Sequence, residues 1–409
     1  MAPGLAADLE DLSPAALVTK HHADAKADQA RLFAAPLAEH VRHSGPQGSI
    51  EPFTIVDDPS AWLAGDYKGK EDSYIYHFTE EDLKEIRAAI AKVEAEGLRI
   101  EGNLVHIQEA VPSREHFLLP ALGPKLEKLG EEVRIGRGFQ LLRGLPVEDL
   151  TRLQILIAYW GFGLHWGNVR SQNAKAHIVG HVKNIGHDVN APLTRVYATP
   201  LAQPMHTDSA DMVALLSLRL AREGGLSSWA SSTSVHNELL RLGRKDLVEE
   251  LSKQQWYVDR KGENPPDKKP YYQLPIFNYY KGFLSSPYTA TYYKLAQRHA
   301  DVPRMTEKQY EALRLYNALA LSDKLRLDLM LQAGDIQLLS NHTQIHTRSA
   351  FVDHPELENR RHLMRLWVSP PEERPLPEQY VELWGSTTPG HRGGIYIGQA
   401  RMTVPLEAE

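Results

Sequence analysis

Cysteine is absent from this sequence of 409 residues. Its absence excludes disulfide bridges, iron–sulfur clusters, thiolate metal sites and cysteine nucleophiles. A transition metal bound by this chain must therefore be held through nitrogen and oxygen atoms, which histidine and carboxylate side chains supply.

The sequence also lacks concentrated positive charge and long hydrophobic runs. The formal net charge is −6, so no basic surface for nucleic-acid phosphates is indicated. Apolar stretches such as residues 155–160 are too short to span a bilayer, and residues 1–19 carry acidic side chains where a signal peptide needs an apolar run. We expect a cytoplasmic protein with a small-molecule substrate and no nucleic-acid or membrane partner; formation of a homo-oligomer is left open.

The pattern of elements favours a mainly β fold with helical insertions. Residues 1–50 are alanine-rich and polar and are interpreted as a partly irregular arm, and residues 51–409 as a single domain. Short apolar runs predict strands at 138–144, 195–198, 212–220, 229–232, 255–258, 336–339 and 362–368. Amphipathic periodicity and capping residues predict helices at 79–96, 120–133, 149–162, 235–251 and 306–321. Such an order is typical of a β-sandwich or barrel.

The motif His206-Thr207-Asp208 lies just before the apolar run 212–220. On a strand, residues two apart project from the same face, so an imidazole and a carboxylate can share one ion; on a helix they would diverge. The same pattern also occurs at His22 and His299, where no core strand is predicted, and both of these are interpreted as surface positions. The pair at 206 and 208 is therefore the candidate metal chelate.

A third ligand must come from elsewhere in the chain. The predicted strand 336–339 leads to His342 and His346, and the residues alone leave both as candidates. On the later strand 362–368, alternation places Arg365 on an apolar face. A guanidinium there needs an anion, which is either a bound carboxylate or a structural Asp or Glu partner.

Four motifs, in this order, resemble the TauD/TfdA-like Fe(II)- and 2-oxoglutarate-dependent dioxygenases, and most closely their fungal members. They are His206-Thr207-Asp208, Gly224-Gly225-Leu226-Ser227, Asn341 to His346 with Arg348, and Arg361 to Arg365. The resemblance implies a double-stranded β-helix (jelly-roll) core over about residues 130–370, flanked by helices. It implies His206, Asp208 and His346 as catalytic iron ligands, with His342 as a neighbour. It further implies that Arg365 grips the distal carboxylate of 2-oxoglutarate, aided by Ser227 where relatives usually have threonine.

The chemistry implied by this resemblance uses Fe(II), 2-oxoglutarate and O₂. We expect oxidation of an unactivated C–H bond in a small polar substrate, an amino acid or carboxylate of secondary metabolism, by hydroxylation, desaturation or cyclisation, with release of succinate and CO₂. Arg348, two residues past His346, is a further candidate for binding the cofactor or an anionic substrate. Gln172, Asn173 and Tyr197 are candidates for contacting the substrate.

Three alternatives remain open at this point. A sulfonate dioxygenase of the same family is one, although Met205 and Ala202 replace the tryptophan and asparagine that taurine-using relatives carry before the first ligand. A zinc hydrolase could use the same ligands, but Arg365 and Ser227 would then have no purpose. A catalytically silent protein that binds 2-oxoglutarate or another metabolite would have no need of all three ligands.

Overall fold

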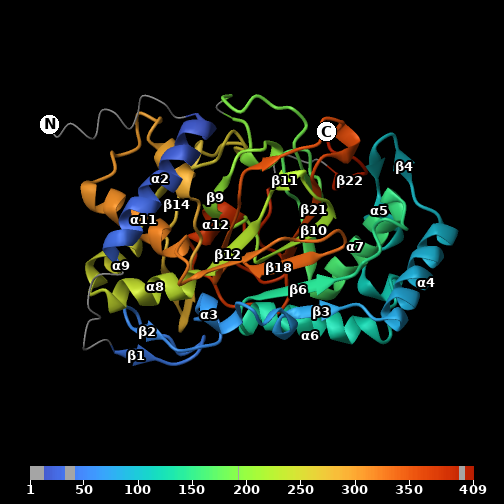
Figure 1. The fold of residues 1–409 in the computed structure, drawn as a ribbon, viewed down its shortest axis with the longest axis horizontal. Helices are drawn as coiled ribbons and strands as arrows, with labels where there is room; N and C mark the ends of the chain where they lie inside the picture. Colours follow the sequence, from blue (N-terminus) through green and yellow to red (C-terminus); the bar gives the residue numbers. More distant parts are fainter. Residues whose placement is uncertain (1–12, 33–41, 192, 396–400) are drawn as a thin grey trace.

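Two sheets form the centre of the molecule and helices lie outside them (Figure 1). The computed structural model describes residues 13–32, 42–191, 193–395 and 401–409. The larger sheet runs in the order β3-β6-β18-β10-β21-β7, with β8 also paired to β21, and the smaller in the order β17-β12-β19-β9. Apart from the parallel pair β3–β6, neighbouring strands in both are antiparallel. The chain is thus mainly sheet at its centre, as the sequence predicts.

The strands of the larger sheet are β3 (Ile75–His77), β6 (Phe139–Arg143), β7 (Asn168–Arg170), β8 (Val179–Lys183), β10 (Met212–Arg219), β18 (Ile336–Ser340) and β21 (His362–Ser369). Those of the smaller sheet are β9 (Gln203–His206), β12 (Ser227–Ser231), β17 (Arg326–Leu329) and β19 (Gln344–Arg348). Short accessory pairs are β1 (His43–Ser44) with β2 (Ile55–Val56), β4 (Ile100–Glu101) and β22 (Val404–Pro405) with β5 (Leu104–Val105), β11 (Glu223–Gly224) with β20 (Phe351–Val352), β13 (Tyr257–Asp259) with β14 (Tyr271–Gln273), and β15 (Asn278–Tyr280) with β16 (Phe283–Ser285).

Alternation along the strands of the larger sheet divides its side chains between two cores. On β10, Met212 and Ala214 belong to a cluster shared with the helices α4 (Glu80–Glu96), α6 (Leu122–Ile135) and α7 (Arg152–Trp166). Val213, between them, belongs to a second cluster that includes Trp229 of the smaller sheet. Because both faces are covered, nearly every residue of β10 and β21 is buried, which accounts for their largely apolar sequences.

A second helical layer covers the outer face of the smaller sheet. It consists of α2 (Pro14–Leu32), α8 (Ser232–Arg241), α9 (Lys245–Leu251), α10 (Ala290–Ala296) and α11 (Glu307–Ala320). Ala230 and Ile345 of the sheet pack into this layer's core. Their strand neighbours Trp229 and His346 therefore point the opposite way, into the space between the two sheets. The remaining short helices are α3 (Ala64–Tyr67), α5 (Ile107–Ala110) and α12 (Tyr380–Trp384).

The predicted helices 79–96, 120–133, 149–162 and 306–321 are confirmed as α4, α6, α7 and α11 to within a few residues. At α4, Thr79 accepts a hydrogen bond from the Asp82 backbone, and the Asp82 carboxylate accepts one from Thr79, so the cap is as predicted. The predicted helix 235–251 is instead two helices, α8 and α9. They are separated by a turn in which Gly243 has φ +71°, a conformation that continues no helix.

The strand predicted at 195–198 is wrong. Residues Val196–Ala198 form a single 3₁₀ turn, which the Thr199 hydroxyl closes by donating to the Val196 carbonyl at 2.8 Å. Local side-chain-to-backbone bonding of this kind competes with extended structure, and it prevails here. The other predicted strands coincide with, or overlap, β6, β10, β12, β13, β18 and β21.

Part of the predicted N-terminal arm is a helix. In α2, Asp28 accepts two hydrogen bonds from the Arg314 guanidinium of α11, at 2.6 and 3.0 Å, and Gln29 donates to the Ala318 carbonyl. These contacts fix α2 against the helical layer. Residues 1–12 and 33–41 of that arm lie outside the described residues. Within the described part of the chain, no helix is both long and apolar enough to cross a membrane.

Candidate metal centre and adjoining cavities

Three side chains from separate segments converge between the two sheets. His206 ends β9, His346 lies in the middle of β19, and the two are direct cross-strand partners. Asp208 follows two residues after His206, and one ligand atom from each of the three lies within 4.8 Å of the other two. Among the residues that the structure describes, no other group of three histidines or acids could hold a metal ion in this way.

The surroundings of the three residues orient them. The ring Nδ1 of His206 lies 2.9 Å from the Pro204 carbonyl, to which it donates, so Nε2 carries the lone pair. That Nε2 accepts a hydrogen bond from the Gln203 amide at 2.9 Å. The backbone N–H of Asp208 donates to the Asn341 side chain, also at 2.9 Å. Asp208 Oδ2 and His346 Nδ1 are buried with no hydrogen-bond partner among the described residues.

The protonation states suit a metal ion. Burial, together with the nearby His206, lowers the pKa of His346 to about 3. Burial also lowers the pKa of His206, against the opposing effect of Asp208. Burial alone would raise the pKa of Asp208, but Arg365 and the two imidazoles outweigh it and lower that pKa. Neutral imidazoles and an ionised carboxylate are the forms in which these side chains bind a metal.

Arg365 of β21 lies beside the three residues. It donates to Asp208 Oδ1 at 2.9 Å through Nη1 and to Gln172 Oε1 at 2.8 Å through Nε. Its guanidinium also lies over the rings of Tyr197 and Trp367, at 5.2 and 4.7 Å from their centroids. Gln172 is occupied in holding Arg365, because its amide also donates to the Arg365 carbonyl at 2.6 Å. Hydrogen bonds and the two aromatic rings thus fix the orientation of the Arg365 guanidinium, and Asp208 is its anionic partner.

A small cavity of about 30 Å³ adjoins the three residues and is rich in cationic side chains. Ser227, Arg348 and Arg361 line it together with Arg365. Arg348 is buried, and its Nε and Nη1 have no hydrogen-bond partner among the described residues, while Nη2 donates to the Thr199 and Leu201 carbonyls. Burial lowers the pKa of Arg348, and the nearby Arg361 lowers it further. Two neighbouring buried guanidiniums, of which that of Arg348 has unused donors, indicate a site for an anion.

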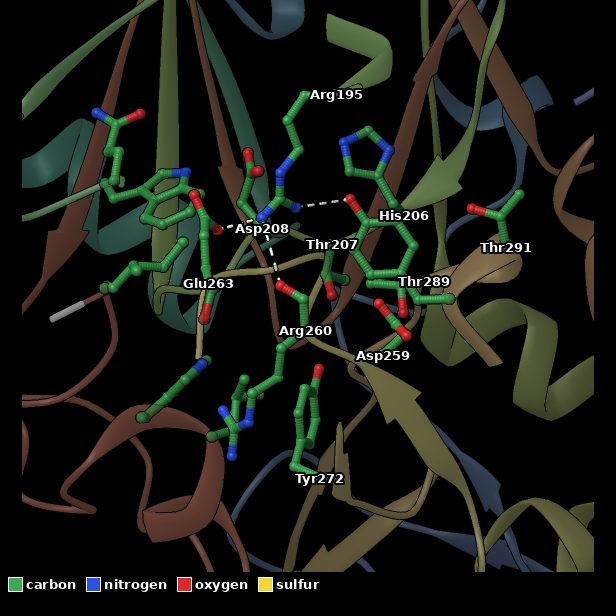
Figure 2. Close-up of a pocket in the computed structure, with 18 of the residues that line it drawn as sticks. Arg195, His206, Thr207, Asp208, Asp259, Arg260, Glu263, Tyr272, Thr289 and Thr291 are labelled. Carbon is green, nitrogen blue, oxygen red and sulfur yellow. Dashed lines mark hydrogen bonds and ion pairs between the residues drawn. The ribbon is translucent and has the colours of Figure 1, made fainter. Parts of the chain in front are cut away.

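A second cavity, of about 310 Å³, opens on the other side of His206 and Asp208. Charged and aromatic side chains line it, among them Arg195, Glu263, Arg260, Tyr272, Tyr292 and Trp384. Figure 2 shows Arg195 pointing toward the centre of this cavity, with dashed lines to Glu263 and to the Arg260 backbone. Tyr197, Gln172 and Arg365 also line this cavity, which places them between the candidate metal centre and the larger space.

The residues predicted from the sequence fall into two groups. His206, Asp208, His346, Arg365, Ser227, Arg348, Gln172 and Tyr197 all line one or both cavities. Asn173 is not among the lining residues, because its side chain caps its own turn by accepting from the Lys175 and His177 backbone. His342 points elsewhere, since its Nε2 bonds to Asp211 Oδ1 at 2.8 Å.

Sequence reasoning missed Arg361, Arg195 and Glu263. A signal for Arg361 was present, because it precedes Leu363 by two residues and strand alternation places it on the same face as Arg365. Arg195 and Glu263 come from irregular segments far apart in the chain, where periodicity carries no information about direction.

Comparison with known proteins identifies the family of this chain. The family model described as "Taurine catabolism dioxygenase TauD, TfdA family" matches residues 106–367. The chain is 31% identical over 323 residues to the taurine hydroxylase-like protein SAT17 of Stachybotrys chartarum, covering 76% of this chain and 79% of that protein. It is 29% identical over 282 residues to the FR-33289 synthase of Streptomyces rubellomurinus, covering 66% of this chain and 81% of that protein.

Solved structures share the fold at lower identity. An asparagine oxygenase in complex with Fe(II), 3-hydroxyasparagine and succinate superposes with a TM-score of 0.54 at 16% identity, covering 72% of this chain and 93% of the other. The non-heme iron oxygenase OrfP in complex with Fe and alpha-ketoglutaric acid gives 0.52 at 14% identity, with the same coverage of 72% and 93%. At such identities the likeness concerns the fold alone.

Proposed function

Because the chain belongs to the TauD/TfdA family of Fe(II)- and 2-oxoglutarate-dependent dioxygenases, we propose that His206, Asp208 and His346 are its iron ligands. The observation that carries this proposal is the convergence of one ligand atom from each residue within 4.8 Å of the others. Two imidazoles and one carboxylate, with the rest of the coordination sphere left open, are the donor set that non-haem iron oxygenases use.

The unused buried atoms support the fit. Asp208 Oδ2 and His346 Nδ1 have no hydrogen-bond partner among the described residues. Burying a polar atom without a partner costs free energy unless a bound ligand supplies the missing interaction. When bound, Fe(II) and 2-oxoglutarate activate O₂ for oxidation of a C–H bond, with release of succinate and CO₂. The chain's own contribution is to hold the ligands in place and to keep Asp208 ionised through Arg365.

The small cationic cavity is the proposed place for the distal carboxylate of 2-oxoglutarate. The family resemblance implies Arg365 and Ser227 as the residues that bind this carboxylate. In the structure Arg365 already donates to an anionic partner, Asp208, whereas the Arg361 guanidinium makes no hydrogen bond to a side chain within the described residues and has only the electrostatic influence of Asp353. We therefore assign the carboxylate to Arg361, with Ser227 and Arg348 beside it. The Ser227 hydroxyl now donates to Gln337 at 2.9 Å and is free to turn toward an incoming oxygen.

The arrangement of the sheets supports the rest of the proposed architecture. The sheets of seven and four strands face each other through the shared cluster that contains Val213 and Trp229. We propose that they are the two halves of a double-stranded β-helix within one domain covering residues 51–409, with the ligands at its mouth.

The proposed substrate is a small polar molecule, an amino acid or carboxylate, that enters the larger cavity. The support is the combination of a volume of about 310 Å³ with charged groups and aromatic walls next to the ligands. Hydroxylation, desaturation and cyclisation all begin by oxidising a C–H bond held at this point, so the residues that orient the substrate decide the outcome.

Anaerobic titration of the protein with Fe(II) and 2-oxoglutarate tests the proposal. A visible charge-transfer band that needs both additions is expected, followed by succinate formation on exposure to O₂. A protein that binds Fe(II) and 2-oxoglutarate but never forms succinate, with or without candidate substrates, would instead be a silent binding protein on the same fold.

A further inference from the structure

A buried ion pair faces the larger cavity and joins two segments that are far apart in the chain. Arg195 donates to the Glu263 carboxylate, and the side chains of both are only about a fifth exposed, at 21% and 20%. Arg195 also donates to the Tyr292 hydroxyl at 2.9 Å and contacts the Arg260 carbonyl, so its guanidinium is held in one orientation (Figure 2). Within the described residues the Glu263 carboxylate has no hydrogen-bond partner other than Arg195, which engages its Oε2.

The position of the pair connects it to the iron site. Arg195 and Glu263 line the same cavity as His206, Asp208 and Arg365. Burial raises the pKa of Glu263, while Arg195 and then Arg365 act to lower it, which means that Glu263 lies within electrostatic reach of the arginine beside the proposed ligands. A molecule that touches the pair is therefore adjacent to the oxidising centre.

Charge balance restricts what such a pair can bind. Arg195 and Glu263 neutralise each other in a site that is largely removed from water. A substrate with a single carboxylate would draw Arg195 away and leave Glu263 buried without a cation, and a simple amine would do the converse; both are costly. A molecule with adjacent carboxylate and ammonium groups satisfies both members at once, because its charges complete a ring of alternating sign.

We propose that Arg195 and Glu263 together bind the zwitterionic head group of an α-amino acid, with the carboxylate on Arg195 and the ammonium on Glu263. The side chain of the amino acid then extends toward His206 and Asp208, between Tyr197 and Trp367, where the bond to be oxidised is held. This inference rests on the proposed function, since it names the substrate class of the same site.

The competing interpretation is that the pair only ties two loops together. The two segments have a second connection, because the Lys261 ammonium donates to the Thr194 carbonyl at 3.2 Å. The substitution Glu263→Gln separates the two interpretations. Glutamine keeps the shape and can still accept a hydrogen bond from Arg195, so a structural tie survives, but it removes the negative charge that an ammonium requires.

The experiment measures binding and turnover separately. The anaerobic protein loaded with Fe(II) and 2-oxoglutarate is titrated by calorimetry with the twenty protein amino acids and, for each one that binds, with its desamino carboxylate and its decarboxylated amine. We expect the amino acid to bind at least 30-fold more tightly than either analogue, roughly the effect of leaving one buried charge unpaired. Glu263→Gln is expected to abolish this preference over the desamino carboxylate while the thermal stability of the protein remains unchanged.

The control is Glu382→Gln at the rim of the same cavity. Glu382 is paired with Arg260 at 2.8 Å and with Lys268 at 2.9 Å, and it is the more exposed carboxylate, so its loss is expected to leave amino-acid preference intact. Binding of none of the amino acids, or an unchanged preference in Glu263→Gln, overturns this inference. If the unmodified protein releases no succinate on exposure to O₂, the result would count against the proposed function instead.

Discussion

His206 and His346 face each other directly across the β9–β19 ladder, with ring centroids 4.2 Å apart. Cross-strand partners have the shortest side-chain separation that a sheet offers, so register alone brings two imidazoles to one point. Asp208 reaches the same point because it lies two residues past His206 along an extended backbone. The positions of the three proposed ligands therefore depend on the pairing of one strand with another.

Removal of any one ligand is expected to abolish the iron site. His206→Ala, Asp208→Ala and His346→Ala should each eliminate the Fe(II)–2-oxoglutarate charge-transfer band and reduce succinate formation by at least about 100-fold. Circular dichroism should show that the fold persists. His22→Ala is the matched control and should retain activity, because His22 belongs to a His-x-Asp motif that lies on α2. Retention of most activity by any of the three variants would contradict the ligand assignment.

The two arginines near the iron site are expected to have different roles. Arg361→Ala should raise the KM for 2-oxoglutarate by roughly 10- to 150-fold, because a charge-assisted hydrogen bond to the distal carboxylate contributes about 1.5–3 kcal/mol. Arg365→Ala should mainly weaken Fe(II) binding, since Asp208 loses the cation that keeps it ionised. Steady-state kinetics and Fe(II) titration of both variants make the comparison. If Arg365→Ala raises that KM more than Arg361→Ala does, Arg365 binds the distal carboxylate, as the family resemblance implies.

Asp211 is expected to be a major stabilising residue although it lies outside both cavities. Its fully buried carboxylate accepts hydrogen bonds from Arg392 Nε, His342 and Ser369, each at 2.8 Å. Asp211→Ala leaves the Arg392 guanidinium buried and unpaired, which should lower the free energy of unfolding by about 3–5 kcal/mol in urea denaturation. Glu249→Ala removes an exposed partner of Lys245 and should change it by less than about 1 kcal/mol. Equal effects of the two substitutions would show that burial of the ion pair is unimportant.

Stability is expected to fall steeply on mild acidification. Burial lowers the pKa of His181 and of His236 to about 4, and that of His362 to about 2, the last also through the adjacent His181. In the unfolded chain such histidines take up protons near pH 6.5, whereas the folded protein does so only at lower pH. The unfolded state therefore binds more protons between pH 6.5 and about 4, and the free energy of unfolding decreases as the pH falls through that window.

Each of these histidines should contribute about 1.4 kcal/mol per pH unit to the slope. Urea denaturation at a series of pH values measures it. His236→Asn should make the slope shallower by about that amount, whatever its effect at pH 7. His77→Asn, at an exposed position, is the control and should leave the slope as it is. A slope unchanged by His236→Asn would refute the assignment of acid sensitivity to buried neutral imidazoles.

Much of the fold and part of the site were predictable from local sequence. The capping residues Thr79 and Thr306 identify the starts of α4 and α11, because a hydroxyl at that position satisfies backbone N–H groups that the helix leaves open. The largely apolar sequences of β10 and β21 indicate strands covered on both faces. The spacing of His206 and Asp208 likewise indicates a chelate, since alternation is a property of any extended segment.

Other features depended on contacts that local patterns do not encode. The residues alone left His342 and His346 as equal candidates, and the resemblance favoured His346. In the structure, the register of β19 with β9 places His346 beside His206, and Asp211 engages His342. The proposed roles of Arg361 and Arg365 likewise differ because Asp208 already accepts a hydrogen bond from the Arg365 guanidinium.

The sequence by itself determined the kinds of atoms available to a metal, the positions of the principal helices and strands, and the family to which the chain belongs. The first two properties follow from composition and from periodicities of a few residues, and the third from the resemblance of four motifs in order. Only the tertiary structure decided which arginine remains available for a carboxylate, and that Arg195 meets Glu263 at the wall of the larger cavity. The physical reason is that charged side chains on loops are paired only when folding brings distant segments of the chain together, and no local sequence pattern specifies that pairing.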